Sequence, residues 1–156
     1  MPHVPSSSRN AVVVRGEVEL GDQRGRTLGF PTANLSIEGT EIKDGVYAGW
    51  LDRGAGLHLA AISIGGRPTF YGRDGFRLLE AHVVDFDDNL YGETVTVWLC
   101  HRIRGQRRFS SLDALVAQLH DDIGACRRWR HSTGWEPAAA DLQDRVPLGT
   151  AMRIAF

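Results

Sequence analysis

The sequence predicts a mostly β domain, an antiparallel barrel or sandwich, completed by one amphipathic helix. Up to residue 103, short β-branched or aromatic segments are separated by glycine-containing turns, a pattern typical of antiparallel sheets. After residue 110, apolar residues recur at helical spacing instead. The chain has 156 residues, which is enough for one domain with its own hydrophobic core.

Five segments are predicted to be strands because they are rich in β-branched and aromatic residues and are bounded by turns. They are Ala11–Leu20, Gly45–Leu51, Leu57–Ile64, Phe76–Phe86 and Glu93–Ile103. Residues 52–56 contain two glycines and predict a hairpin between the second and third segments. Residues 1–10 are rich in proline and serine and predict a flexible lead-in.

The helix prediction rests on an apolar stripe and on its flanking polar residues. The stripe consists of Leu112, Leu115, Val116, Leu119, Ile123 and Trp129. Ser110 followed by Asp113 resembles a capping box at the N-terminus. Arginines at 127, 128 and 130 suit a helix C-terminus, where the helix dipole favours cations. Residues 131–156 show no clear period, so the sequence does not decide whether they pack on the sheet.

The composition of the chain restricts the classes of function that we expect for it. The formal net charge is −1, which gives no reason to expect binding to nucleic acid or to acidic membranes. The apolar runs are short and no signal peptide is recognisable, so we expect a cytoplasmic protein. Cys100 and Cys126 are too few for a disulfide framework or a metal ribbon, and we expect both to be small core residues.

The glycine-rich stretch at residues 25–35, GRTLGFPTANL, is the first candidate site. Glycine allows backbone to approach a ligand closely. Thr32 and Asn34 lie two residues apart and therefore on one side of an extended segment. Their neutral oxygens suit a Mg²⁺ ion whose remaining ligands are phosphate and water. The alternative is a Gly-Pro loop in which Thr and Asn bond their own backbone.

Phosphate groups at such a site would need another source of positive charge than a P-loop lysine. The chain has no Gly-x-x-x-x-Gly-Lys motif, and Lys43 is its single lysine. Backbone N–H groups, an arginine or a metal must therefore neutralise the phosphate.

Glu80 is the candidate general base. In the predicted strand it shares one face with His82 and with apolar residues that look like core: Phe76, Leu78, Val84 and Phe86. A carboxyl group in apolar surroundings has a raised pKa, which suits a general base. The alternative is an ion pair between Glu80 and an arginine at the end of the barrel. His82 is expected to be a satisfied core or rim histidine, because no second ligand stands at metal-binding spacing.

Several segments between residues 11 and 129 together resemble the riboflavin kinase family, in particular the bacterial form that usually makes up the C-terminal half of a bifunctional FAD synthetase. Each segment alone is a weak signal, whereas the ordered set is specific. The set comprises Arg15–Val18, Gly21-Asp22, Arg24–Leu35, Gly45–Ala48, Ser63–Gly65, Arg67–Phe70, Glu80–Phe86, Leu90–Gly92, Ile103-Arg104, Phe109 and Asp122-Ile123.

This resemblance implies a six-stranded antiparallel Greek-key barrel with a C-terminal α-helix. It implies a kinase that transfers the γ-phosphoryl group of ATP to the terminal ribityl hydroxyl of riboflavin, giving FMN and ADP, with Mg²⁺ or another divalent metal. By position, Thr32 and Asn34 match the metal-binding pair, and Glu80 matches the catalytic base. The remaining implied contacts are Gly21, Arg26, Val83, Asp85 and Tyr91 for the nucleotide, and Arg104, Arg107 and Phe109 for the flavin.

The expected organisation is a flexible segment at 1–10, a riboflavin kinase-like barrel plus helix at 11–130, and an extension of unknown role at 131–156. The expected partners are ATP and riboflavin only, and the expected state is a monomer. No adenylyltransferase half is matched, so FAD synthesis is not expected unless the chain is a fragment of a longer protein.

Two other functions stay open. One is a flavin- or nucleotide-binding module without catalysis, against which the joint presence of Thr32, Asn34 and Glu80 argues. The other is a kinase acting on a modified flavin or another small alcohol. The loops at 65–75 and 105–109 should frame the acceptor and would decide between these substrates.

Overall fold

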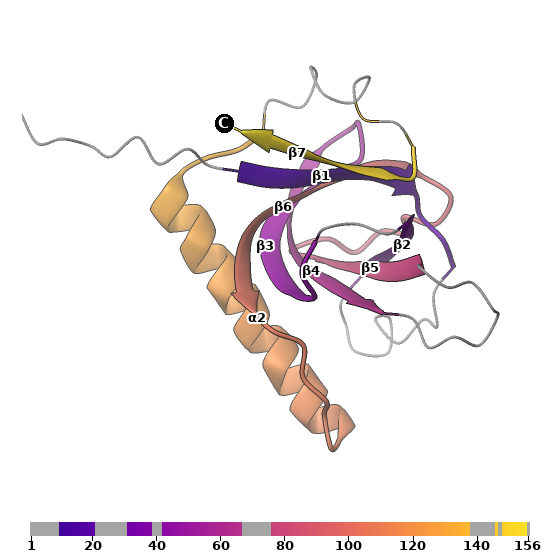
Figure 1. Cartoon of the computed structure of the whole chain (residues 1–156). Helices are drawn as coiled ribbons and strands as arrows, with labels where there is room; N and C mark the ends of the chain where they lie inside the picture. Colours follow the sequence, from indigo (N-terminus) through magenta and orange to yellow (C-terminus); the bar gives the residue numbers. More distant parts are fainter. Residues whose placement is uncertain are drawn as a thin grey trace, which may run out of the picture.

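The structure, a computed structural model, describes residues 10–20, 31–38, 42–66, 76–137, 146 and 148–155. Seven antiparallel strands form one curled sheet, and a long helix lies against its outside (Figure 1). The order along the sheet is β2-β5-β4-β3-β6-β1-β7. The elements are β1 (Asn10–Glu17), β2 (Thr32–Glu38), β3 (Gly45–Asp52), β4 (Leu57–Gly66), β5 (Phe76–Val83), β6 (Thr94–Arg104), α2 (Leu112–Thr133) and β7 (Thr150–Ala155).

The prediction of a mostly β antiparallel fold with one C-terminal helix is confirmed, but the expected number of six strands is wrong. The described residues contain seven strands, and two of them are not among the five segments predicted from their residues: β2, in the glycine-rich stretch, and β7, in the segment without a clear period. β7 pairs with β1 from Asn10↔Ala155 to Arg15↔Thr150. Pairing with an already formed edge strand, rather than any pattern of its own, therefore makes this segment a strand.

The chain just past β1 reaches across to β2, which lies at the far end of the sheet order. The N–H of Glu19 donates to the carbonyl oxygen of Asn34 at 2.8 Å, and these two residues form an isolated antiparallel bridge. The bridge ties together two parts of the curl that are otherwise separated by four strands.

Gly49 allows β3 and β6 to approach each other closely. The β3–β6 register shifts between Val46 and Tyr47 and again between Ala48 and Gly49, and such irregularities bend a strand. A Cβ atom on Gly49 would lie 1.7 Å from the carbonyl oxygen of Trp98. Only glycine is therefore compatible with this crossing.

Two apolar cores lie on opposite faces of the sheet. The inner core fills the curl and contains, among others, Leu35, Leu51, Ile62, Leu79 and Val97. The outer core lies between the sheet and α2 and includes Trp50, Leu59, Ala61, Trp98, Ile123 and Cys126. Strands buried on both faces lose the simple alternation of apolar and polar residues. In such a strand, as in β5, the sequence does not identify the face that points into the inner core.

Helix α2 begins one residue later than predicted. Its N-cap is Ser111, whose Oγ accepts a hydrogen bond from the N–H of Ala114, so the assignment of Ser110 as cap is wrong. Leu112 was expected on the buried stripe but is 55% exposed. The buried residues lie in the middle of the helix, and its N-terminal end extends past the sheet (Figure 1).

The rest of the helix follows the predicted pattern. Leu119 and Ile123 are buried, and Arg130 and His131 are basic residues in the last turn. Gly134 caps the C-terminus in the left-handed conformation, with φ of 59°, and donates its N–H to the carbonyl oxygen of Arg130.

Both cysteines are protonated at neutral pH. Cys126 is buried in the outer core, where its Sγ donates to the carbonyl oxygen of Ala60 at 3.6 Å, so its prediction as a small core residue is confirmed. Cys100 is only partly buried. Burial raises the pKa of each thiol to about 12.

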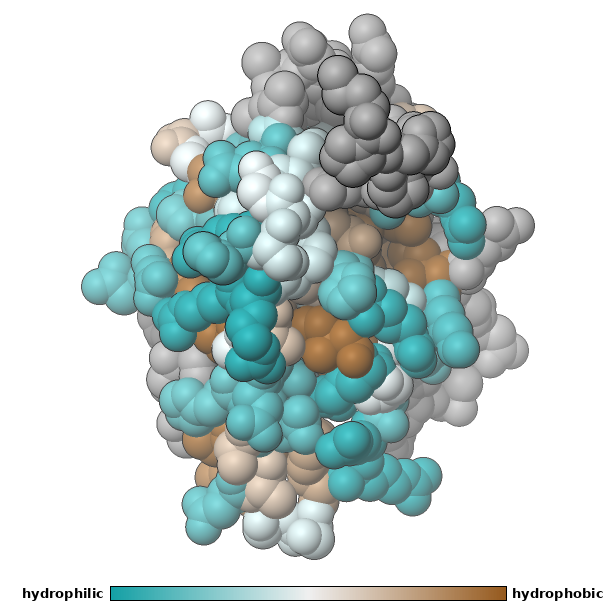
Figure 2. All heavy atoms as spheres, turned by 90° about the vertical axis from the view of Figure 1, so that its left-hand side faces the viewer, coloured by the Kyte–Doolittle hydropathy of each residue, from teal (hydrophilic) through white to brown (hydrophobic). Residues whose placement is uncertain are grey.

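Figure 2 shows the side of the molecule on which α2 lies in Figure 1. Hydrophilic residues dominate this face, and apolar residues appear in small patches between them. Within the part of the chain that the structure describes, no helix has the length and apolar character needed to cross a membrane.

Candidate functional site

β2 carries a polar row on the face opposite the inner core. Ala33, Leu35 and Ile37 are each at most 1% exposed and point into the curl. Thr32 and Asn34 alternate with them and are partly exposed on the outer face. The predicted placement of these two side chains on one side of an extended segment is confirmed.

β5 places Glu80 on the outer face as well, which corrects the expected orientation of this strand. Leu79, Ala81 and Val83 are the members of the inner core, whereas Glu80 is only partly buried and His82 is buried on the opposite face. The alternation was misread because both faces of the β5 segment carry apolar residues. Because Glu80 does not lie among the core side chains, only its position in the sheet supports its assignment as a general base.

The sheet register brings these outer-face residues of β2 and β5 together. Thr32 lies opposite His82, and Asn34 lies opposite Glu80. The N–H of Val83 donates to the carbonyl oxygen of Pro31 at 3.0 Å. Because hydrogen-bonded and non-hydrogen-bonded pairs alternate along an antiparallel ladder, both side-chain pairs occupy non-hydrogen-bonded positions, where side chains approach most closely. We call Thr32, Asn34, Glu80 and His82 the polar patch.

The polar patch continues into β4 and the loop after β6. Ser63 lies opposite Glu80 on the β4 side. The Nε2 group of Gln106 donates to Ser63 Oγ and to the carbonyl oxygen of Ile64, each at 2.8 Å. The start of loop 105–109 is thereby anchored two strands away from Asn34. The sequence does not predict this contact between Ser63, in a segment that carries the resemblance, and Gln106, in loop 105–109, because the two residues are 43 positions apart and no local pattern relates them.

A buried ion pair joins the end of β6 to α2. Arg104 Nε and Nη2 donate to Oδ1 and Oδ2 of Asp122, both at 2.8 Å. Side-chain exposure is 12% for Arg104 and 1% for Asp122. Gln118 Nε2 also donates to Asp122 Oδ1 at 3.0 Å. Asp122 is one of the residues that carry the resemblance, which implies no role for it, and its hydrogen bonds show that it holds Arg104 in place.

The three predicted flavin residues lie around this ion pair. The guanidinium carbon of Arg104 is 5.9 Å from the centroid of the Phe109 ring, within cation–π range. Arg107 Nη1 donates to Oε1 of Gln118 at 3.1 Å. The structure thus brings Arg104, Arg107 and Phe109 together beside the first half of α2.

The structure does not bring all of the residues predicted to contact the nucleotide together in one place among the described residues. Gly21 and Arg26 lie outside the described residues. The Val83 side chain is 1% exposed in the inner core, so only its backbone is available to a ligand. Asp85 has a positive φ of 52°, which aspartate tolerates better than most residues, and it pairs with Arg127 at 3.0 Å on the surface.

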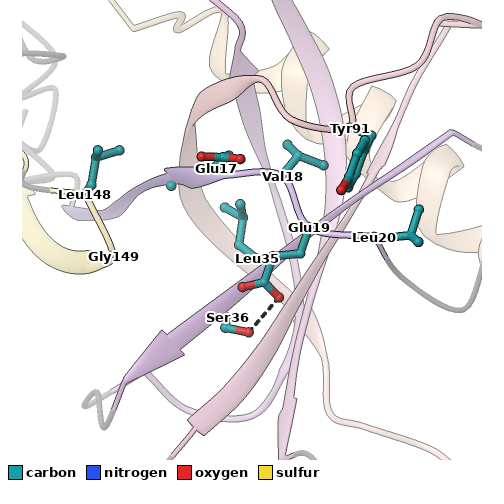
Figure 3. A pocket seen from close by; sticks show the side chains of 10 residues that line it. Glu17, Val18, Glu19, Leu20, Leu35, Ser36, Tyr91, Leu148 and Gly149 are labelled. Atoms are coloured by element: carbon teal, nitrogen blue, oxygen red, sulfur yellow. Dashed lines mark hydrogen bonds between the residues drawn. The ribbon is translucent and has the colours of Figure 1, made fainter.

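Tyr91 is 58% exposed and lines a separate cavity of about 590 Å³. Figure 3 shows its ring beside Val18 and Leu20, with the Ser36–Glu19 hydrogen bond of 2.8 Å below them. The lining reaches β2 at Leu35 and Ser36 but does not include the four residues of the polar patch. This cavity is therefore not the place where the candidate metal and base residues converge.

His82 is a satisfied buried histidine, as predicted. Its Nδ1 lies 3.1 Å from Oγ1 of Thr32. Burial lowers the pKa of His82 to about 4, and the nearby carboxylate of Asp122 opposes this shift in part. The imidazole is therefore neutral at physiological pH.

This lowered pKa predicts a loss of stability in mild acid. The unfolded chain binds a proton at His82 below a pKa of about 6.5, whereas the folded chain resists it until about pH 4. Stability should therefore fall as the pH drops from about 6.5 to 4, by about 3 kcal/mol from this group. Urea unfolding at several pH values should show this slope, and His82→Asn should flatten it. An equally steep slope in the variant would assign it to other groups.

The donor set of the polar patch fits a weakly held hard cation. The hydroxyl of Thr32 and the amide oxygen of Asn34 are neutral donors on one face. Among the described residues, no cluster of three or more His, Cys, Asp and Glu side chains could hold a metal ion. Such neutral oxygens suit Mg²⁺ that arrives with phosphate oxygens and water as its other ligands.

A curled antiparallel sheet that gathers neutral oxygens and a carboxylate on one face has the groups that a small-molecule phosphotransferase needs. Residues 8–130 match the family model described as Flavokinase: Riboflavin kinase. Because the match covers most of the chain, the protein belongs to the riboflavin kinase family.

Similar proteins agree with this assignment. The chain is 38% identical over 120 residues to the bifunctional riboflavin kinase/FMN adenylyltransferase of Haemophilus influenzae, covering 75% of this chain and 38% of that protein. It is 37% identical over 111 residues to the RNA-binding riboflavin kinase RibR of Bacillus subtilis, covering 71% of this chain and 48% of that protein. The chain therefore spans less than half the length of either relative.

The fold also resembles a solved structure over nearly its whole length. The crystal structure of riboflavin kinase from Trypanosoma brucei superposes with a TM-score of 0.61 at 24% identity and covers 96% of this chain and 99% of that one. At this identity the likeness concerns the fold.

Proposed function

We propose that this protein is an ATP:riboflavin 5'-phosphotransferase, which converts riboflavin and ATP to FMN and ADP. One observation carries the proposal within the family. Glu80 stands between the Thr32–Asn34 pair on one side and Ser63, anchored to loop 105–109, on the other. A carboxylate at this junction can serve an acceptor hydroxyl while the phosphate is held next to it.

In the proposed step, the Glu80 carboxylate takes the proton of the terminal ribityl hydroxyl. The hydroxyl oxygen forms a bond to the γ-phosphorus, and the bond from that phosphorus to the bridging oxygen breaks, so that ADP leaves with the electron pair. Phosphoryl transfer depends mainly on positioning and charge stabilisation. Thr32 and Asn34 would hold a divalent cation, which offsets phosphate charge when bound.

The other residues take supporting roles. Arg26 is the proposed cation near the phosphates and Gly21 the proposed close-approach glycine, together with the backbone of Val83 and the side chains of Asp85 and Tyr91 on the nucleotide. Phe109 and Arg107 are proposed to contact the flavin. Arg104 is already paired with Asp122, so we assign it chiefly to orienting the Phe109 ring against the flavin.

The proposal also covers the barrel, the division of the chain, the metal, the cellular location and the oligomeric state. We infer that the seven-stranded sheet is the Greek-key barrel of the family, joined where Glu19 bridges Asn34, with β7 as its edge strand beside β1. Residues 11–130 would form the catalytic unit, residues 1–10 a lead-in and residues 131–156 an extension. The proposed enzyme uses Mg²⁺ and acts as a cytoplasmic monomer.

The proposal predicts that purified protein makes FMN from riboflavin, ATP and Mg²⁺, with one ADP formed per FMN. Mass spectrometry detects FMN and its mass distinguishes it from FAD. Riboflavin binding without FMN would instead indicate a binding module, and neither binding nor product would direct the search to modified flavins or other alcohols.

A further inference from the structure

The residue opposite Thr32 has no role in the step proposed above. His82 faces Thr32 across the β2–β5 ladder, in a non-hydrogen-bonded position where the two side chains meet directly. Their Oγ1 and Nδ1 atoms are 3.1 Å apart. His82 is 9% exposed, so surrounding side chains restrict the orientation of its imidazole.

We propose that His82 is a positioning residue that orients the hydroxyl of Thr32 toward the cation of the metal–nucleotide complex. A threonine hydroxyl has one proton to donate and two lone pairs to offer. If the proton points at Nδ1 of His82, both lone pairs of Oγ1 point away from the imidazole. The inference rests on the proposed function, because it assumes that Thr32 is a ligand to that cation.

This role fixes the tautomer of the imidazole. Nδ1 must be an acceptor, so the ring proton must sit on Nε2. With the opposite tautomer, Nδ1–H would donate to Oγ1 and take one of its two lone pairs, and the hydroxyl proton, no longer held by Nδ1, would compete with the cation for the side of Oγ1 that faces away from the imidazole. The arrangement follows a general feature of metal sites, in which a partner behind the ligand sets the direction of its donor atom.

The binding test uses Mn²⁺·ADP, followed by electron paramagnetic resonance of free Mn²⁺. His82→Leu should weaken binding about 10-fold, the lower end of the range for partners of metal ligands. His82→Asn, which keeps an acceptor near Nδ1, should stay within about 3-fold on the same scale. In a Thr32→Val background, His82→Leu should cause no further loss, and ADP binding in EDTA should be equal in all variants.

Unchanged Mn²⁺·ADP binding in His82→Leu would overturn the proposal. So would a loss of equal size in the Thr32→Val background or in EDTA, because each would point to a general structural effect. Wild-type protein that binds Mn²⁺·ADP but makes no FMN would contradict the proposed reaction alone, and the same variants would then still decide the role of His82.

A second measurement does not depend on the folding of any His82→Leu variant. Nitrogen-15 spectra of the wild-type histidines distinguish a protonated from an unprotonated imidazole nitrogen, and the His82 signals are those missing from His82→Asn. We expect Nδ1 to be unprotonated and Nε2 to be protonated, with and without Mg²⁺·ADP. A proton on Nδ1 would overturn the proposal.

Discussion

Replacing Glu80 by glutamine should lower kcat for FMN formation by roughly 10²- to 10⁴-fold, the range that a general base contributes. Glutamine has nearly the same shape but accepts no proton at neutral pH. The change leaves Asn34 and Ser63, which flank Glu80 in the sheet, in their places. Binding of Mg²⁺·ADP should therefore stay close to the wild-type value.

The control for this experiment is Glu136→Gln, which removes an exposed carboxylate just after the end of α2. That variant should keep wild-type kcat. Thermal unfolding of both variants should show that neither has lost its structure. A kcat for Glu80→Gln within a few-fold of wild type, or a decrease matched by lost stability, would contradict the assignment of Glu80 as base.

The elements that the sequence predicted well are those whose signals are local. The hairpin between β3 and β4 is marked by glycines at 54 and 56, and α2 by its 3.6-residue period. β7 carries no such signal, because Thr150–Ala155 becomes a strand through its pairing with β1. The prediction of which face of β5 points into the inner core was wrong for a related reason. Apolar residues on both of its faces removed the alternation that would have identified the inner face.

The candidate site likewise has some features that local spacing predicts and others that depend on distant parts of the chain. The two-residue spacing of Thr32 and Asn34 indicated a shared face, and β2 confirms it. The position of Glu80 opposite Asn34 could not be derived from spacing, because strand register is set by the whole sheet. The contact between Ser63 and Gln106 could not be predicted for the same reason. Each is an ordinary polar residue until β4 and the loop after β6 meet.

Separating Arg104 from Asp122 should cause the largest loss of stability. Asp122→Leu leaves the guanidinium of Arg104, which is 12% exposed, without its partner. Arg104→Met leaves the carboxylate of Asp122, which is 1% exposed, without its partner. Breaking a buried pair in this way costs about 3–5 kcal/mol. For a chain of this size, that corresponds to a decrease in Tm of roughly 6–20 °C. Scanning calorimetry of the two single variants measures it.

The double variant Arg104→Met/Asp122→Leu separates folding from binding. Replacing both partners of a buried ion pair by apolar residues is often neutral for stability, so most of the lost Tm should return. Riboflavin affinity should stay low, because Phe109 loses the guanidinium that lies 5.9 Å from its ring and Gln118 loses its acceptor on Asp122. Recovery of riboflavin binding together with Tm would show that the pair serves folding alone.

The matched control is the exposed pair of Arg127 and Asp85, whose side chains are 50% and 74% exposed at a separation of 3.0 Å. Water screens such a pair, and its contribution is about 0–1 kcal/mol. Arg127→Met should therefore change Tm by less than about 4 °C. If it destabilises as much as Arg104→Met, the loss at Arg104 comes from removing a long side chain that packs against α2, and burial of the unpaired charge is not its cause.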